Sequence, residues 1–226
     1  MKSLAILAAL AINFGTASCT HTQPPTLRHE PQDITADGPY TQASSGMIFP
    51  EQMGPFRRQL IRQHDTAGEN VSVGYWSGGP DHYAMITVYV YPAPIEISVF
   101  PAPMVKETPR NLVEGHFQSV KADVLRAWPG MRLVSEEKWT LKQEGRSYEG
   151  LRAMFEGPGH VEYKPTQLVS YAYLFTHGKW FIKYRVTFPS SHKAMAEPAV
   201  ENFMTSLTWP TGTWYVLPRK AVPFSD

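Results

Sequence analysis

The chain has 226 residues, of which 42% are hydrophobic and 12% aromatic, which is enough to bury one sizeable core. Its formal net charge is +1, and removal of a leader that carries Lys2 would leave acidic and basic residues in equal number. This balance argues against a nucleic-acid-binding protein, which needs a basic surface, and a single cysteine excludes an internal disulfide.

Residues 1–18 are predicted to be a signal peptide. Lys2 supplies the positive charge, and residues 4–14 form an apolar run that is too short to span a bilayer as a mature helix. Small residues follow at positions 15–18, and then Cys19. The segment resembles a bacterial lipoprotein signal with its lipobox, which implies that Cys19 is acylated, with chains such as palmitate, and becomes the first mature residue.

One position departs from that pattern. Thr16 stands where a large aliphatic residue is usual, which leaves cleavage by an ordinary signal peptidase near Ala17 as the alternative. The resemblance implies a lipid-anchored protein of the cell envelope that faces the periplasm. Thr20 follows Cys19 in place of Asp, which by the same resemblance favours the outer membrane over the inner.

Residues 19–45 are rich in Pro, Thr, Gln, Asp and Ser, which predicts a flexible tether. A tail that packs on the domain is the alternative. A single domain is expected at residues 46–210. The C-terminal tail, residues 211–226, carries Trp214 and Tyr215 and is expected to dock in part.

The first half of the domain is predicted to be an antiparallel meander. Residues 56–63, 71–75 and 84–91 show the period-two alternation that is typical of strands, and residues of turn composition separate them.

A Pro-rich passage at residues 92–103 follows the meander, and it is predicted to be an exposed edge or loop because proline cannot donate ladder hydrogen bonds. Its apolar Ile95, Ile97 and Phe100 are candidate contact residues for an envelope protein partner. Folding back onto the core is the alternative for these side chains.

A helix is predicted at residues 108–128, with Thr108 as its N-cap and apolar side chains at i, i+4 spacing along one stripe. His116 lies on this stripe, where a half-buried structural role is the ordinary one. Strands are predicted within residues 131–142 and 146–156, and the glycines at 157–159 are expected to break the chain.

The most regular stretch, residues 168–189, predicts a β-hairpin that turns near Gly178. Lys183 and Arg185 are expected to face water, so the other face of that strand must cover a core. A second amphipathic helix is predicted at residues 191–207. Pro198 fits an early helical position, which suggests that the helix proper begins near Glu197.

These elements predict the α+β class, with an antiparallel β-sheet covered by two amphipathic helices. The order resembles the PsbP-like α/β/α sandwich over about residues 46–210. The resemblance depends on packing and turn positions: Gly178-Lys179-Trp180, residues 184–189, the closing helix through Phe203 and Leu207, and residues 89–92. That family has no shared catalytic site to carry over, and its members are mostly assembly or accessory factors.

No motif indicates a named reaction. The eight histidines show no metal-ligand spacing, no serine stands in a nucleophile elbow, and no phosphate-binding glycine loop is present in the sequence. We therefore expect no metal and no cofactor. Glu136 and Glu137 are adjacent in a predicted strand, so their side chains point to opposite faces.

Two surfaces are candidate binding sites. Arg57, Arg58 and Arg62 could recognise an anionic partner or a lipid headgroup, the alternative being a solvated strand face. A set of aromatic residues could line an apolar pocket between sheet and helix, the alternative being ordinary core packing. The aromatic set is Tyr163, Tyr171, Tyr173, Trp180 and Tyr184.

The sequence thus favours a non-enzymatic binding or accessory factor for a protein or a small apolar ligand, anchored to the membrane through Cys19. The alternative is a hydrolase that acts on envelope material with a site assembled from distant residues, and a third class is a purely structural component. A pocket whose titratable groups perturb one another would favour the enzyme. An apolar groove without them would favour the binding protein.

Overall fold

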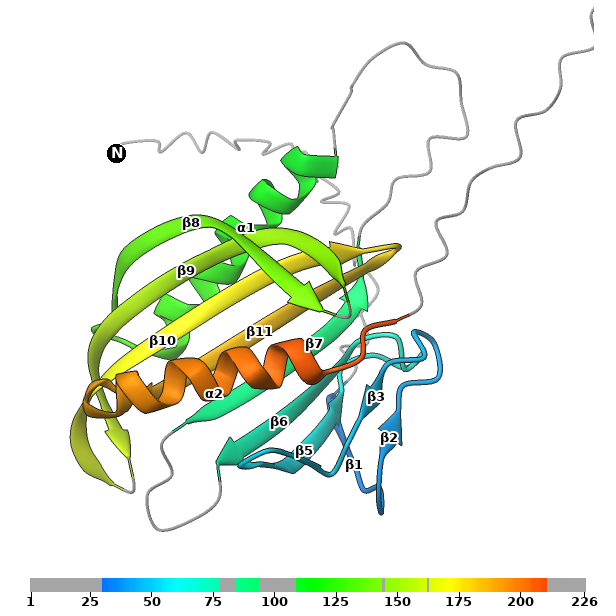
Figure 1. Cartoon of the computed structure of the whole chain (residues 1–226), viewed down its shortest axis with the longest axis horizontal. Coiled ribbons are helices and arrows are strands. Elements are labelled where there is room, and N and C mark those ends of the chain that lie inside the picture. Colours follow the sequence, from blue (N-terminus) through cyan, green and yellow to red (C-terminus); the bar gives the residue numbers. More distant parts are fainter. Residues whose placement is uncertain (1–29, 78–83, 94–108, 144, 162, 211–226) are drawn as a thin grey trace, which may run out of the picture.

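In the computed structural model, residues 30–77, 84–93, 109–143, 145–161 and 163–210 are described. They form one antiparallel sheet of nine strands, a separate pair of short strands, and two α-helices (Figure 1). This arrangement confirms the predicted α+β class.

The first half of the domain is made of short N-terminal strands followed by the predicted meander. Its strands are β1 (Gln32–Ile34), β2 (Tyr40–Thr41), β3 (Ile48–Phe49), β4 (Gln52–Met53), β5 (Phe56–Gln63), β6 (Val71–Ser77) and β7 (Met85–Pro92). The predicted strands at 56–63, 71–75 and 84–91 are confirmed within two residues at each end.

The second half begins with a helix and ends with one. Its elements are α1 (Pro109–Ala127), β8 (Arg132–Gln143), β9 (Arg146–Val161), β10 (Lys164–His177), β11 (Trp180–Pro189), a short 3-10 turn (Ser190–His192) and α2 (Lys193–Ser206). The hairpin of β10 and β11 is paired over its full length, from Leu168 opposite Pro189 to His177 opposite Trp180.

The two halves join where β7 pairs with β11. The order in the sheet is β1-β5-β6-β7-β11-β10-β9-β8, and β4 pairs with β5 outside this path. The last strand of the described residues, β11, therefore lies in the middle of the sheet, between β7 and β10.

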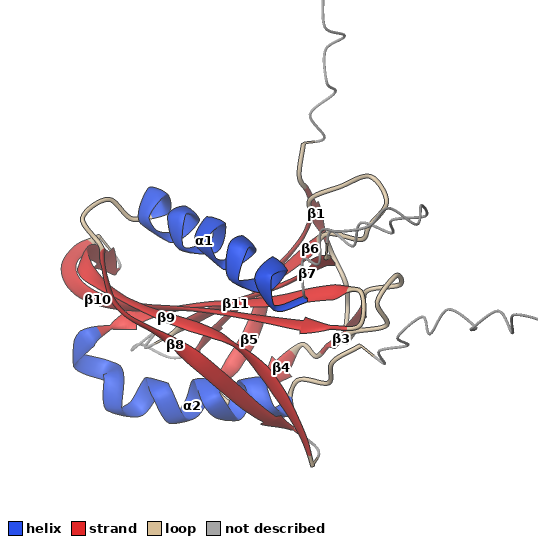
Figure 2. Ribbon diagram, turned by 90° about the horizontal axis from the view of Figure 1, so that it is seen from above, coloured by secondary structure: helices blue, strands red, loops and turns tan. Residues whose placement is uncertain are grey.

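The two helices lie on opposite faces of the sheet (Figure 2). Under α2 lies the larger core, which includes Tyr184, Phe188 and Phe203. Under α1 lies the smaller one, which includes Phe117 and Phe155. Because both faces carry a helix, the molecule is built in three layers.

Both faces of β11 are consequently covered, which corrects one expectation. Trp180, Ile182 and Tyr184 are buried, as predicted, and the core that they join lies on the α2 side. Lys183 and Arg185, which were expected to face water, are half-buried on the α1 side. The alternation identified the two faces, but it could not show that a helix would lie on the charged one.

Strand β9 does not end where the glycines predicted a break. It continues through residues 157–159 to Val161. A Cβ on Gly157 would lie 2.7 Å from the Gly130 carbonyl oxygen, and one on Gly159 would lie 2.2 Å from Leu168 Cδ1. Glycine is needed here because a neighbouring segment approaches the strand closely, and not because the chain turns.

The second helix also begins earlier than Pro198 suggested. It starts at Lys193, so Pro198 lies inside it and leaves one backbone carbonyl without its usual donor. Ala196, Val200 and Phe203 are buried against the sheet. This packing outweighs the local cost of the proline.

The N-terminal strands belong to the fold, although residues 19–45 were predicted to be a tether. Strand β1 pairs with β5, and β2 pairs with β3. For residues 30–45, the alternative of a tail that packs on the domain fits the structure, and the fold extends further toward the N-terminus than residue 46.

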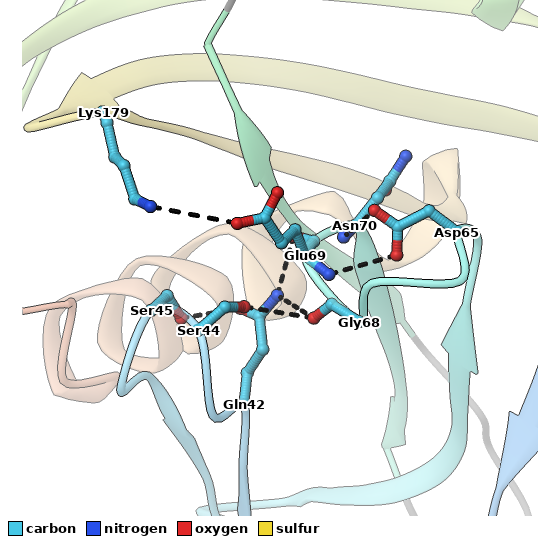
Figure 3. Close-up of polar contacts among 8 residues, drawn as sticks. All are labelled: Gln42, Ser44, Ser45, Asp65, Gly68, Glu69, Asn70 and Lys179. Atoms are coloured by element: carbon cyan, nitrogen blue, oxygen red, sulfur yellow. Dashed lines mark hydrogen bonds and ion pairs between the residues drawn. The ribbon is translucent and has the colours of Figure 1, made fainter.

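A buried polar cluster holds this N-terminal segment to the turn between β5 and β6 (Figure 3). Gln42, which is fully buried, donates through Nε2 to the backbone carbonyls of Gly68 at 3.2 Å and Glu69 at 2.8 Å. Ser45 Oγ donates to Gln42 Oε1 at 2.6 Å, and the Asp65 carboxylate accepts the Glu69 backbone N–H at 3.1 Å. The cluster fixes the turn and the N-terminal segment to each other.

Several predictions fall on residues outside the described part of the chain. They concern the signal peptide with Cys19, the partner contacts Ile95, Ile97 and Phe100, and the C-terminal tail at 211–226. They remain predictions.

Candidate functional site

A cavity of about 330 Å³ lies between α2 and the strands β8–β10. Its size falls at the lower end of the range for small-molecule sites. Strands β8 to β11 contribute Trp139, Leu141, Arg152, Met154, Tyr171, Tyr173 and Phe188, and α2 contributes Lys193, Glu197, Val200, Glu201 and Met204.

Local periodicity explains why these side chains meet. Arg152 and Met154 alternate with buried neighbours along β9, and the register places them opposite Tyr173 and Tyr171. On α2, charged residues recur at i, i+4, i+8 beginning with Lys193, so they share one face of the helix. A strand face of period two and a helix face of period 3.6 together enclose the cavity.

Arg152 is the best-fixed group of the site. Its guanidinium carbon lies 3.8 Å from the centroid of the Trp139 ring and 5.4 Å from that of Tyr171. Its Nε donates to Glu137 Oε1 at 3.0 Å. Burial alone would lower the pKa of Arg152, but the hydrogen bond that it donates to Glu137 and the further interactions with Tyr173 and Glu137 together outweigh burial, so the pKa is raised. Arg152 therefore remains charged and oriented over the aromatic floor.

On the helix side, Glu197 connects two neighbours. Tyr171 donates its hydroxyl hydrogen bond to Glu197 Oε1, and Lys193 Nζ lies 3.8 Å from the same oxygen. The carboxylate thus links α2 to β10 across the cavity. It also balances one of the two cations that line the wall.

The two tyrosines of the floor remain protonated at neutral pH. Burial, reinforced by the hydrogen bond to Glu197, raises the pKa of Tyr171. Burial also raises the pKa of Tyr173 to about 12, although the Arg152 charge acts in the opposite direction. Both groups therefore act as hydrogen-bonding phenols and not as bases.

These properties suit binding. Arg152 and Lys193 oppose Glu197 and Glu201, so the four formal charges of the lining cancel. The other lining residues are aromatic or aliphatic, apart from the hydroxyls of the tyrosines. Such a surface fits a ligand with an apolar or aromatic body and no net charge.

Within the described ranges, no group of three or more His, Cys, Asp or Glu is placed to hold a metal ion. Residues 30–77, 84–93, 109–143, 145–161 and 163–210 also contain no helix that is long and apolar enough to cross a membrane.

The predicted aromatic pocket is realised in part. Tyr171 and Tyr173 line the cavity. Trp180 and Tyr184 are buried in the core instead, and Tyr163 is 98% exposed. The alternation along β10 and β11 placed the residues on faces correctly, but it could not show which part of a face α2 leaves open.

The predicted arginine surface does not form one site. Arg57 is exposed, and Arg62 pairs with Asp33 through Nε at 2.6 Å. Arg58 lies in a second hollow of about 280 Å³ and donates to three backbone carbonyls, those of residues 36, 38 and 49, at 2.7–2.8 Å. Arg58 thus anchors the N-terminal segment and has little capacity left for an anion.

The charged half of the cavity was not predicted from the sequence. Arg152 sits in an alternating strand where a basic residue usually marks a solvated face. Lys193 and Glu197 stand at i, i+4 beside an apolar stripe, which was a usable signal for a polar wall. No local signal brings β9 and α2 together, because they are separated by the whole hairpin of β10 and β11.

Comparison with solved structures gives similarities at low sequence identity, among them the following two. The chain is similar to the solution structure of cyanobacterial PsbP (CyanoP) from Synechocystis sp. PCC 6803, with 13% identity, a TM-score of 0.47, and coverage of 76% of this chain and 91% of that one. It is also similar to a protein of unknown function from Pseudomonas aeruginosa described as a putative regulator, with 13% identity, a TM-score of 0.39, and coverage of 77% and 97%.

No family model matches the sequence, and no curated protein matches it.

Proposed function

We propose that this protein is a non-enzymatic binding factor whose ligand occupies the cavity between α2 and β8–β10. The proposal is supported by the residues that line the cavity. They form an aromatic floor, and the formal charges of the four charged residues at its border cancel. The favoured ligand is small, has an apolar or aromatic body, and is uncharged or zwitterionic. The PsbP-like character of the domain and an accessory role in the cell envelope are part of the same proposal.

The setting of this activity is proposed from the leader. Cys19, acylated, would hold the domain at the periplasmic side of an envelope membrane, the outer membrane being favoured. A ligand met there could be free or part of an envelope protein partner. Titratable groups of the cavity do perturb one another, which is the feature expected of the hydrolase alternative, but the pKa values of Arg152, Tyr171 and Tyr173 are all raised away from neutrality. None of these three groups is therefore poised to act as an acid or base near pH 7, and the binding role is favoured.

Titration with the uncharged fluorescent probe N-phenyl-1-naphthylamine tests the proposal. The full chain should bind it saturably, with one probe per chain. Trp139→Ala should weaken binding about tenfold, because an aromatic contact of this kind contributes roughly 0.5–1.5 kcal/mol beyond its buried area.

The chain offers a matched control. Trp76→Ala removes a 45%-exposed tryptophan of β6 that does not line the cavity, and it should leave probe affinity unchanged. An equal loss in both variants, or a linear response without saturation in the parent, would contradict the proposed site.

A further inference from the structure

The face of the sheet that carries α1 is covered only in part by the described residues. Helix α1 packs over β9, β10 and Phe181 through its buried side chains Phe117 and Val120. Farther along the sheet, Leu60 of β5 and Trp76 of β6 are 39% and 45% exposed. The border between the covered and open parts runs along β7 and β11.

Two cations lie at this border. Lys183 and Arg185 are two positions apart on β11, so their side chains point to the same face, about 7 Å apart along the strand. Both are half-buried. The ammonium of Lys183 lies 4.0 Å from the centroid of the Tyr89 ring.

Asp123 attracts both cations, but neither has an anion within ion-pair distance among the described residues. Within the described ranges, Lys183 and Arg185 form no ion pair or hydrogen bond, and the Nε of Arg185 is buried without a partner. A buried N–H of a charged group that lacks an acceptor is costly, so such groups are almost always satisfied by protein, solvent or a ligand.

The other charged groups near the pair are already engaged. Asp123 of α1 accepts from Arg126 at 2.7 Å, and Arg62 of β5 is paired with Asp33.

Two histidines border the same surface, one on each side of the cations. His116 Nε2 is 2.8 Å from the Tyr91 hydroxyl. His64 stacks on Tyr89 with ring centroids 6.3 Å apart and shares a 2.8 Å hydrogen bond with Ser72. Burial and neighbouring cations such as Lys183 lower the pKa of both histidines. The positive charge of the border therefore comes from Lys183 and Arg185, beside the hydrogen-bonding histidines and phenols.

We propose that Lys183 and Arg185, with Tyr89 beside them, form a binding site for a phosphate group. A guanidinium offers two parallel N–H donors to the oxygens of such a group, and an ammonium adds a compact charge on the other side. A dianion between them would compensate both cations and supply the acceptor that Arg185 lacks. This site is on the opposite face of the sheet from the cavity, so it does not depend on the function proposed above.

Burial and the neighbouring Arg185 charge lower the pKa of Lys183 to about 8, against the attraction of Asp123. A phosphate bound beside the ammonium would raise this pKa again. The protonation of Lys183 is therefore a second reporter of occupancy, independent of affinity.

The test is a titration of the full chain with sodium phosphate at pH 7, at constant ionic strength kept by sodium chloride, followed by amide NMR. Saturable shifts should centre on residues 89, 183 and 185. Lys183→Met should weaken binding at least tenfold, Arg185→Lys should weaken it less, and Lys138→Met, an exposed lysine of β8, should change nothing. The last variant controls for the loss of one positive charge.

A second arm identifies the source of the phosphate. Flotation of the chain carrying Cys19→Ser with phosphatidylglycerol vesicles, compared with phosphatidylcholine vesicles, tests a lipid headgroup, and capture that falls with Lys183→Met supports that source. Phosphate binding without such capture supports a soluble phosphate-bearing ligand. Absence of saturable shifts in the folded parent, or equal phosphate affinity in parent and Lys183→Met, would overturn the site.

Discussion

Arg152 and Lys183 are two basic residues on strands of the same sheet, but their surroundings differ in whether a carboxylate pairs with the charge. Arg152 has a carboxylate partner and a tryptophan ring against its guanidinium, so it remains protonated although it is partly buried. Lys183 has the ring of Tyr89 but no ion-pair partner in the described part of the chain. The carboxylate that attracts it, Asp123, is paired with Arg126. Arg152 is thus a fixed part of a cavity wall, whereas the charged form of Lys183 is disfavoured by its burial.

Because burial disfavours the charged form of Lys183, the free energy of unfolding should depend on pH. The pKa of Lys183 is about 8 in the folded protein, compared with 10.5 for an ordinary lysine. Between these values the unfolded chain binds more protons than the folded one, so the free energy of unfolding should rise with pH. We expect a gain on the order of 1–2 kcal/mol between about pH 8 and 9.5 in urea denaturation.

Lys183→Met should abolish this gain and be more stable than the parent near pH 7, whereas Lys138→Met should keep it. The range ends below about pH 10 because buried tyrosines such as Tyr89, whose pKa burial raises, oppose the effect once the unfolded chain ionises. Parallel curves for the parent and Lys183→Met would show that the lysine is solvated.

At the scale of elements, strand β9 depends on glycine for its contacts with the segment after α1. The Cβ of an alanine at 157 would meet backbone atoms, the Gly130 carbonyl oxygen and the Met131 Cα, both at 2.7 Å. Backbone cannot give way as the end of a side chain can. The strand and the turn after α1 therefore fit only with glycine there.

Gly157→Ala should accordingly destabilise the protein by about 1–3 kcal/mol, the range for overpacking. Gly115→Ala is the matched control, since Gly115 lies exposed within α1 and an added Cβ meets nothing within 4 Å. It should stabilise by roughly 0.5–1 kcal/mol. Chemical denaturation of both variants measures this, and an unchanged Gly157→Ala would mean that the turn after α1 relaxes.

At the scale of the whole molecule, the lipid anchor proposed at Cys19 would decide where the protein acts. We expect the mature chain to begin at Cys19 with acyl chains attached, because Cys19 follows the apolar run of the leader and is the single cysteine of the sequence. A triacylated cysteine would hold the protein stably at a membrane. Mass spectrometry of the N-terminal peptide from native membranes measures this. A chain that begins at Ser18, or an unmodified Cys19, would refute it, and Cys19→Ser should move the protein to the soluble fraction.

Much of the fold could be predicted because its signals are local. The alternation of Phe56–Gln63 and of the β10–β11 hairpin, and the apolar stripe of α1, each lie within a few residues of sequence. The pairing of β7 with β11 could not be predicted, since no local pattern records which distant strand is a neighbour. The cavity was missed in part for the same reason, because Arg152 and Glu197 come from elements that only the complete fold brings together.

The junction of β7 and β11 also constrains the order in which the chain can fold. Strand β7, which carries Ile86, Val88 and Val90, has an unpaired edge until β11 has been synthesised and has paired with it. Pairing between strands so distant in sequence is slow, and an open apolar edge is a template for association with other chains. During synthesis the N-terminal meander is thus an incomplete sheet, and its β7 edge is open to pairing with other copies until the C-terminal hairpin covers it.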